Sequence, residues 1–157
     1  MDFDSRGEKV KVLLQAGEKV ETLWAERVGA DRFRLQNSPF WAYGVSWLDV
    51  VHARPDATGM LAMTDVVEKS GHRTLRVFLD APPNESPRDA AILQGVNALG
   101  CTYEGMTSRY VAVDVPPSID LASVEAYLTQ HRAQWEHADP TFEDIHGNPA
   151  PASRPAV

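Results

Sequence analysis

The chain has 157 residues, 43% of them apolar, which suits one globular domain or two small subdomains that share a core. Its formal net charge of −7 argues against a nucleic-acid partner, because binding to phosphate backbones needs clustered Lys and Arg side chains. The single Cys101 excludes an internal disulfide and a four-thiolate zinc site. No apolar run approaches the roughly 18 residues of a membrane span, and the first residues lack the basic-then-apolar order of a signal peptide. We therefore expect a cytoplasmic protein without a membrane partner.

The first half of the chain is rich in strand signals. Residues 1–7 are polar and are expected to be a loose N-terminus, and a strand-rich subdomain follows over residues 8–72. Period-two alternation between turn-forming residues predicts short strands. These strands are expected over residues 9–14, 20–28, 32–35, 45–52 and 60–69. Such a run of short antiparallel strands is typical of a small meander or a closed barrel.

Residues 73–142 change to a pattern in which strands alternate with helices. Ser86-Pro-Arg-Asp89 offers an N-cap, a Pro at the first helical position and an acid in the first turn, and Gly100 ends that helix. Asp120 is expected to cap a second helix. Strands are predicted over residues 74–79, 101–106, 109–115 and 135–142.

The order strand, helix, strand, strand, helix, strand is that of a ferredoxin-like unit. The predicted fold class is therefore α+β, with a small antiparallel meander or barrel packed on a ferredoxin-like βαββαβ half. Residues 143–157 are rich in Pro and predict a disordered tail.

An aromatic segment connects the third and fourth predicted strands. Its Trp41, Tyr43 and Trp47 are too large and too close together for a plain solvated loop. One interpretation is a binding wall for a flat ligand or for an apolar side chain of a partner. The other, which we favour, is that these rings fill the seam between the strand layer and the helical half.

Asp49 follows this segment within the apolar strand predicted over residues 45–52. A carboxylate at such a place needs partners, because burial without them is costly. It is a candidate general base or cation ligand, but more often such an Asp fixes a neighbouring turn by accepting backbone N–H groups. His52 lies on the opposite face of that strand and cannot share the side of Asp49.

A second focus is the turn Ser70-Gly-His-Arg73. Gly71 permits a positive φ and Ser70 can bond its own turn, so a tight hairpin explains both residues. Histidine is a common general base, and His72 together with Glu68 and Ser70 suggests a hydrolase. Because no nucleophile elbow, phosphate cradle or helical His pair accompanies it, we favour a hydrogen-bonded His72 at the layer interface and assign no catalytic residue.

The remaining candidates are single charges and scattered histidines. Arg109, at a strand start, either faces a ligand beside the sheet or is a surface charge. The histidines near the C-terminus lie among acidic residues, but their spacing matches no helical ligand pair, so we expect neither a metal nor a cofactor.

Several segments together resemble a known bacterial family, catalogued as a domain of unknown function (number four-two-six-five). The resemblance covers most of residues 9–137 and implies a small cytoplasmic bacterial protein, without an activity that could be carried over. The segments are Glu21-Thr-Leu-Trp-Ala-Glu26, Phe40-Trp-Ala-Tyr-Gly-Val-Ser46, Asp49-Val-Val51, Val66-Val-Glu-Lys-Ser-Gly-His72 and Ala112-Val-Asp-Val-Pro116.

Three functions remain open on this sequence. The first is a non-catalytic binding or inhibitory module that engages a protein partner through its acidic surface and edge strands, as immunity or antitoxin-like proteins do. The second is a sensor that binds a small molecule at the aromatic seam between subdomains. The third is a hydrolase-type enzyme that uses Asp49 and His72. An exposed edge strand would also permit a homodimer.

Overall fold

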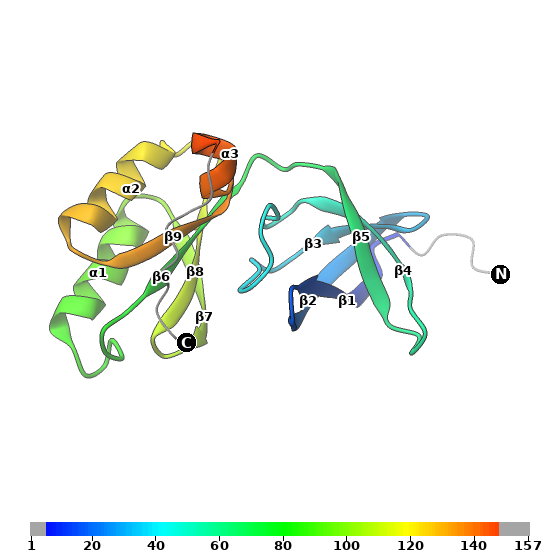
Figure 1. Cartoon of the computed structure of the whole chain (residues 1–157), viewed down its shortest axis with the longest axis horizontal. Helices are drawn as coiled ribbons and strands as arrows, with labels where there is room; N and C mark the ends of the chain where they lie inside the picture. Colours follow the sequence, from blue (N-terminus) through cyan, green and yellow to red (C-terminus); the bar gives the residue numbers. More distant parts are fainter. Residues whose placement is uncertain (1–5, 148–157) are drawn as a thin grey trace.

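The structure is a computed structural model that describes residues 6–147. It consists of two halves that lie side by side, a five-stranded barrel and a four-stranded sheet covered by helices (Figure 1). The fold class is α+β, as predicted.

The first half is a closed barrel rather than an open meander. Its neighbouring strands are antiparallel, and the first and last strands close it as a parallel pair in which Val12 lies opposite Leu61. Inward positions are apolar at every second residue and make the barrel core. The strands are β1 (Lys9–Ala16), β2 (Lys19–Gly29), β3 (Arg32–Leu35), β4 (Val50–Pro55) and β5 (Leu61–Glu68).

The strand predicted over residues 45–52 is wrong in its first part, because β4 begins only at Val50. Leu48 has a φ of 69° and Asp49 donates its N–H to the carbonyl of Ser46, so the chain turns here instead of extending. Residues 36–49 form one irregular segment that covers the end of the barrel facing the sheet (Figure 1). Ala42 and Val45 of this segment belong to the barrel core, and their apolar character imitates a strand.

The second half is an antiparallel sheet with the strand order β7-β8-β6-β9. Alternate residues of β6 and β8 pack with both long helices in one core, so the helices cover a single face of the sheet. Cys101 lies in this core, and burial raises the pKa of its thiol to about 11. The elements are β6 (Arg73–Phe78), α1 (Pro87–Ala98), β7 (Thr102–Thr107), β8 (Tyr110–Val115), α2 (Leu121–Gln130) and β9 (Gln134–Asp139).

The helix ends follow the sequence signals only in part. Ser86 accepts the N–H of Asp89 at the start of α1, as expected of an N-cap. Asp120 is the N-cap of α2 but makes no capping hydrogen bond with its side chain.

A short third helix, α3 (Phe142–His146), occupies a stretch that the Pro-rich composition assigned largely to a disordered tail. Thr141 and Asp144 form a capping box, in which each side chain accepts the backbone N–H of the other residue. This local device stabilises one helical turn before Gly147 ends it with a φ of 76°. The rest of the predicted tail, residues 148–157, lies outside the described residues.

Gly95 lets the two long helices approach closely. A Cβ atom at this position would lie 1.8 Å from the hydroxyl oxygen of Tyr127, which donates to the carbonyls of Ala91 and Ile92. We expect Gly95→Ala to lower the free energy of unfolding by about 1–3 kcal/mol, although Ala normally favours a helix. Denaturant unfolding measures this, with Asn97→Ala at an exposed position of α1 as the control. The loss should shrink in combination with Tyr127→Ala; full additivity would contradict the steric explanation.

Candidate functional site

The candidate site is the joint between the halves, where residues 36–49 cross the helix-free face of the sheet. At the β7 side, the carboxylate of Glu104 accepts Nδ2 of Asn37 at 2.9 Å and the backbone N–H of Ser38 at 2.5 Å. At the β9 side, Gly44 donates its N–H to the carbonyl of Ala138 at 2.8 Å. We use the word joint for residues 36–49 together with the side chains of both halves that bind them.

Arg76 lies at the centre of this face and is completely buried. Its guanidinium group donates to the carbonyl oxygens of Pro39, Trp41 and Ala42. The ring of Tyr43 lies 4.8 Å from its Cζ atom. A planar group with five donors suits several carbonyls at once, which a Lys could not bind in the same way.

Glu21 holds the same segment from the barrel side. Its carboxylate accepts the backbone N–H groups of Phe40, Trp41 and Ala42 at 2.7, 2.8 and 2.9 Å. The segment therefore has its N–H groups bound by an acid of the barrel and its carbonyls by a base of the sheet. Neither Glu21 nor Arg76 was identified from the sequence. The one indication of their role was that each is a charged residue inside a predicted strand.

The aromatic side chains of the joint are used mainly for packing. Trp41 stacks on Tyr110 with 5.2 Å between ring centroids, and Nζ of Lys19 lies 4.2 Å from the Trp41 ring. Tyr110 in turn stacks on Phe78 and donates its hydroxyl to the carbonyl of Phe40. Tyr43 differs, because it is 42% exposed. Its hydroxyl bonds the carboxylate of Glu136.

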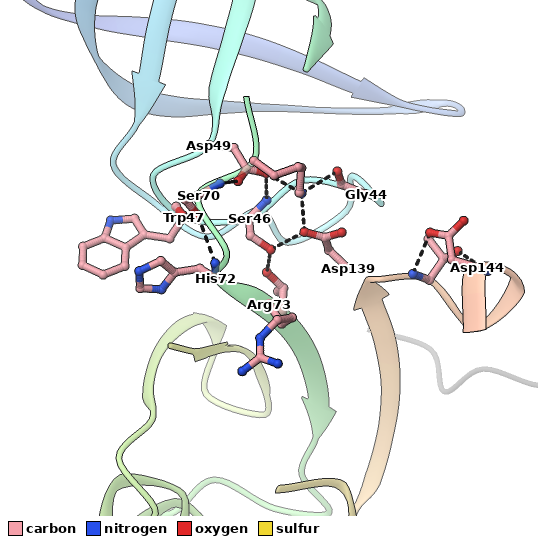
Figure 2. A network of polar contacts seen from close by, with 12 residues as sticks. Gly44, Ser46, Trp47, Asp49, Ser70, His72, Arg73, Asp139 and Asp144 are labelled. Atoms are coloured by element: carbon pink, nitrogen blue, oxygen red, sulfur yellow. Dashed lines mark hydrogen bonds and ion pairs between the residues drawn. The ribbon is translucent and has the colours of Figure 1, made fainter. Parts of the chain in front are cut away.

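A polar network at the other end of the segment surrounds Asp49 (Figure 2). Asp49 is fully buried and accepts the backbone N–H groups of Ser46 and Ser70, each at 2.8 Å, and Nζ of Lys69 at 2.6 Å. Nζ of Lys69 also binds Asp139 at 2.5 Å. Asp49 thus fixes two turns and shares a cation with a residue of the opposite half.

Ser46 completes this network from inside. Its hydroxyl lies 2.6 Å from Oδ2 of Asp139 and 2.7 Å from Oγ1 of Thr74. An ionised carboxylate only accepts, so Ser46 donates to Asp139 and accepts from Thr74. Ser46 is fully buried and its one proton is bound, so it is not arranged as an accessible nucleophile.

The charge of Lys69 is stabilised by its two acidic neighbours. Burial lowers the pKa of Lys69, but hydrogen bonds with Asp139 and Asp49 outweigh this effect and raise the pKa overall. Lys69 is consequently an ammonium group at neutral pH and acts here as a cationic bridge between the two halves.

His72 lies beside this network but binds other partners. Its Nδ1 is 2.9 Å from a carboxylate oxygen of Asp114, and its ring meets the Trp47 ring edge-on at 4.9 Å. Burial raises the pKa of Asp114, while the neighbouring His72 opposes that shift. Asp49 and His72 share Ser70 as a partner, because the N–H of Ser70 binds Asp49 and its hydroxyl accepts the N–H of His72.

The structure therefore brings five of the six predicted site residues to the joint, namely Trp41, Tyr43, Trp47, Asp49 and His72. The sixth, Arg109, is exposed at the turn between β7 and β8, where its Nε donates to the carbonyl of Leu79. Sequence reasoning missed joint residues that bind across the chain, among them Glu21, Lys69, Arg76, Glu104 and Asp139.

The structure also bears on metal binding. Among residues 6–147, no group of three or more His, Cys, Asp or Glu side chains is arranged to hold a metal ion. Nε2 of His137 lies 3.3 Å from Glu125, an ion-pair distance without hydrogen-bond geometry.

No helix of the described chain is long and apolar enough to cross a membrane.

Comparisons with known proteins agree with the resemblance noted in the sequence. The model of the family described as "Domain of unknown function (DUF4265)" matches residues 21–138. The chain belongs to this family. The DUF4265 match begins at Glu21 and includes all of residues 36–49, so the central contacts of the joint lie within the family domain.

One solved structure is similar in fold to this DUF4265 protein, and its title is "Novel crystal structure of a hypothetical protein from Neisseria gonorrhoeae". The two share 17% sequence identity at a TM-score of 0.68, over 85% of this chain and 96% of that chain. At this identity the likeness concerns the fold alone. No curated protein matches the chain.

The central Arg76 gives a first prediction for the joint. We expect Arg76→Met to lower the free energy of unfolding by about 3 kcal/mol or more, because it leaves buried carbonyls without donors. Arg76→Lys should recover little of this loss. Urea unfolding measures both, and Arg32→Met at an exposed position of β3 is the control, with an expected change within about 0.5 kcal/mol. A small effect of Arg76→Lys would contradict the role of the planar guanidinium.

Lys69 gives a pH-dependent prediction. Because its folded-state pKa lies above the ordinary value of 10.5, its stabilising contribution is fully present below that pH and is lost as the pH rises through the raised pKa. We expect Lys69→Met to destabilise the protein at pH 8 by about 1–2 kcal/mol, a modest value because the side chain is 46% exposed. Urea unfolding at pH 8, 10 and 11 should show this difference shrinking only at the highest pH; a constant difference would contradict the ion pairs.

Proposed function

We propose that this protein is a non-catalytic binding module that engages a protein partner, of the kind that inhibitory or immunity proteins represent. The observation that carries the proposal is the state of the candidate reactive groups. Asp49, Ser46 and His72 are bonded to the chain itself and hold the joint together. This structural use of the candidate reactive groups favours binding over chemistry.

The distribution of charge supports a partner of opposite sign. Residues 6–69 carry nine basic and nine acidic side chains, whereas residues 70–147 carry five basic and eleven acidic ones. The barrel half is therefore nearly neutral and the sheet half strongly negative. A basic protein would be attracted to the sheet half, and its encounter would be faster at low salt.

Exposed apolar side chains supply a second support. Outward-facing Val20 and Trp24 of β2 and Tyr103 and Met106 of β7 are more than a third exposed. Side chains of this kind are enriched at protein interfaces and give binding energy where charge mainly gives attraction. Of these four residues we assign Tyr103 and Met106, on the β7 strand of the acidic half, to the partner site, and not Val20 or Trp24 of the barrel.

The small-molecule and hydrolase alternatives need free polar groups beside the aromatic rings. In the joint, Trp41 packs on Tyr110 and the carboxylate of Asp49 has three donors, so both alternatives receive less support. We further infer that the second half is a ferredoxin-like unit, and the strand order β7-β8-β6-β9 supports this inference. We also infer that the protein works in the bacterial cytoplasm without a nucleic-acid partner.

Charge reversal tests the proposed function. The tagged wild-type protein should enrich a basic protein from cells of its source, measured by quantitative mass spectrometry. Lys substitutions at Asp80, Glu85 and Glu143, all exposed on the sheet half, should reduce that enrichment at least about tenfold. The same change at Glu8, Glu18 and Glu68 on the barrel half is the matched control. Equal effects of both triple variants, or no enriched protein, would contradict the proposal.

A further inference from the structure

We propose that the free edge of β7 binds an extended segment of the protein partner, which pairs with it as an additional strand of the sheet. This inference rests on the proposed function and specifies its binding site. The partner segment is expected to be rich in β-branched residues and to carry Lys or Arg.

The first support is the position of β7. Within residues 6–147 it pairs with β8 alone and forms one border of the sheet. All of its residues are exposed except Glu104, which is intermediate. The opposite border, β9, is partly occupied, because Ala138 accepts the N–H of Gly44 and forms a bridge with Thr141. The edge of β7 is thus the more open of the two.

The second support is that β7 lacks most of the features that usually prevent an edge strand from pairing with another chain. Such features include Lys, Pro and bulges. The single charged residue of β7 is Glu104, and its carboxylate is directed to Asn37 and Ser38 of the joint. A bulge between Gly105 and Thr107 is a guard of this kind, and it limits regular pairing to Thr102–Gly105.

The third support is the side chains that border this stretch. Tyr103 and Met106 are 37% and 46% exposed, and Gly105 between them presents bare backbone. In strand addition the main chain gives affinity and the alternate side chains give specificity. An incoming strand would meet Tyr103 as an aromatic neighbour, which favours β-branched residues at the facing positions.

Charge decides between a partner segment and a second copy of this chain. A symmetric β7 pair would bring together two sheet halves, each with eleven acidic and five basic side chains over residues 70–147. Like charges at this density oppose pairing, whereas a segment with Lys or Arg is attracted. We therefore assign the edge to a basic partner segment.

The test uses the full chain, labelled with ¹⁵N, and a capped heptapeptide of alternating Lys and Val as the probe. Titration followed by NMR should shift the amide signals of Thr102–Gly105 first. A peptide of alternating Glu and Val should bind at least about tenfold more weakly. The Lys/Val peptide with N-methyl groups on alternate residues keeps its charge but lacks the backbone N–H groups that would donate to β7. Its binding should therefore also fall at least about tenfold.

Variants separate this inference from the proposed function. Tyr103→Ser with Met106→Ser should weaken the probe and the captured partner, whereas Val20→Ser with Trp24→Ser on the barrel should leave both unchanged. Probe binding that maps elsewhere or survives N-methylation overturns strand addition. So does a wild-type dimer that the β7 variant converts to a monomer in sedimentation. If a basic partner is captured equally well by the wild type and by the β7 variant, this inference is overturned while the proposed function stands.

Discussion

The segment 36–49 buries more peptide groups than the neighbouring strands bond, and this requirement shapes the joint. Buried N–H and C=O groups without partners are costly, so partners must come from side chains. Glu21 supplies acceptors from the barrel and Arg76 supplies donors from the sheet. Arg76 of the sheet half binds its carbonyl partners only when residues 36–49 lie against the sheet. Separation of the halves would expose the segment and take these carbonyls away from the guanidinium group of Arg76, so the protein behaves as one unit.

The Lys69 bridge adds a second attachment at the far end of the same segment. Asp49 belongs to the barrel side and Asp139 to the end of β9, and one ammonium group joins them. The same residues that resemble catalytic groups in the sequence, an Asp in an apolar run and a His after a tight turn, are therefore explained by the joint. Asp49 is buried and has three donors, and Nδ1 of His72 is paired with Asp114, so both side chains serve the joint.

Local patterns were sufficient to predict most strands, the two long helices and the start of α1 at Ser86, because these depend on neighbours in sequence. The joint was predictable only as an aromatic seam. The partners of Arg76 lie 34–37 residues away, and no periodicity indicates which carbonyls it meets. Val45 was misread because a residue that fills the end of a barrel is as apolar as one in a strand. The helix α3 was missed because one capping box outweighs a disfavoured composition nearby.

The rigid joint also bears on binding at β7. Glu104 lies on this strand and holds Asn37 and Ser38, so the edge is tied to the same segment that Arg76 and Glu21 fix. A pre-ordered edge loses little conformational entropy when a partner strand adds to it, which strengthens binding without any new contact. Weakening the joint, for example through Arg76, should then reduce partner affinity even though Arg76 is buried and touches no partner. Function on this fold would be coupled to stability through one buried guanidinium group.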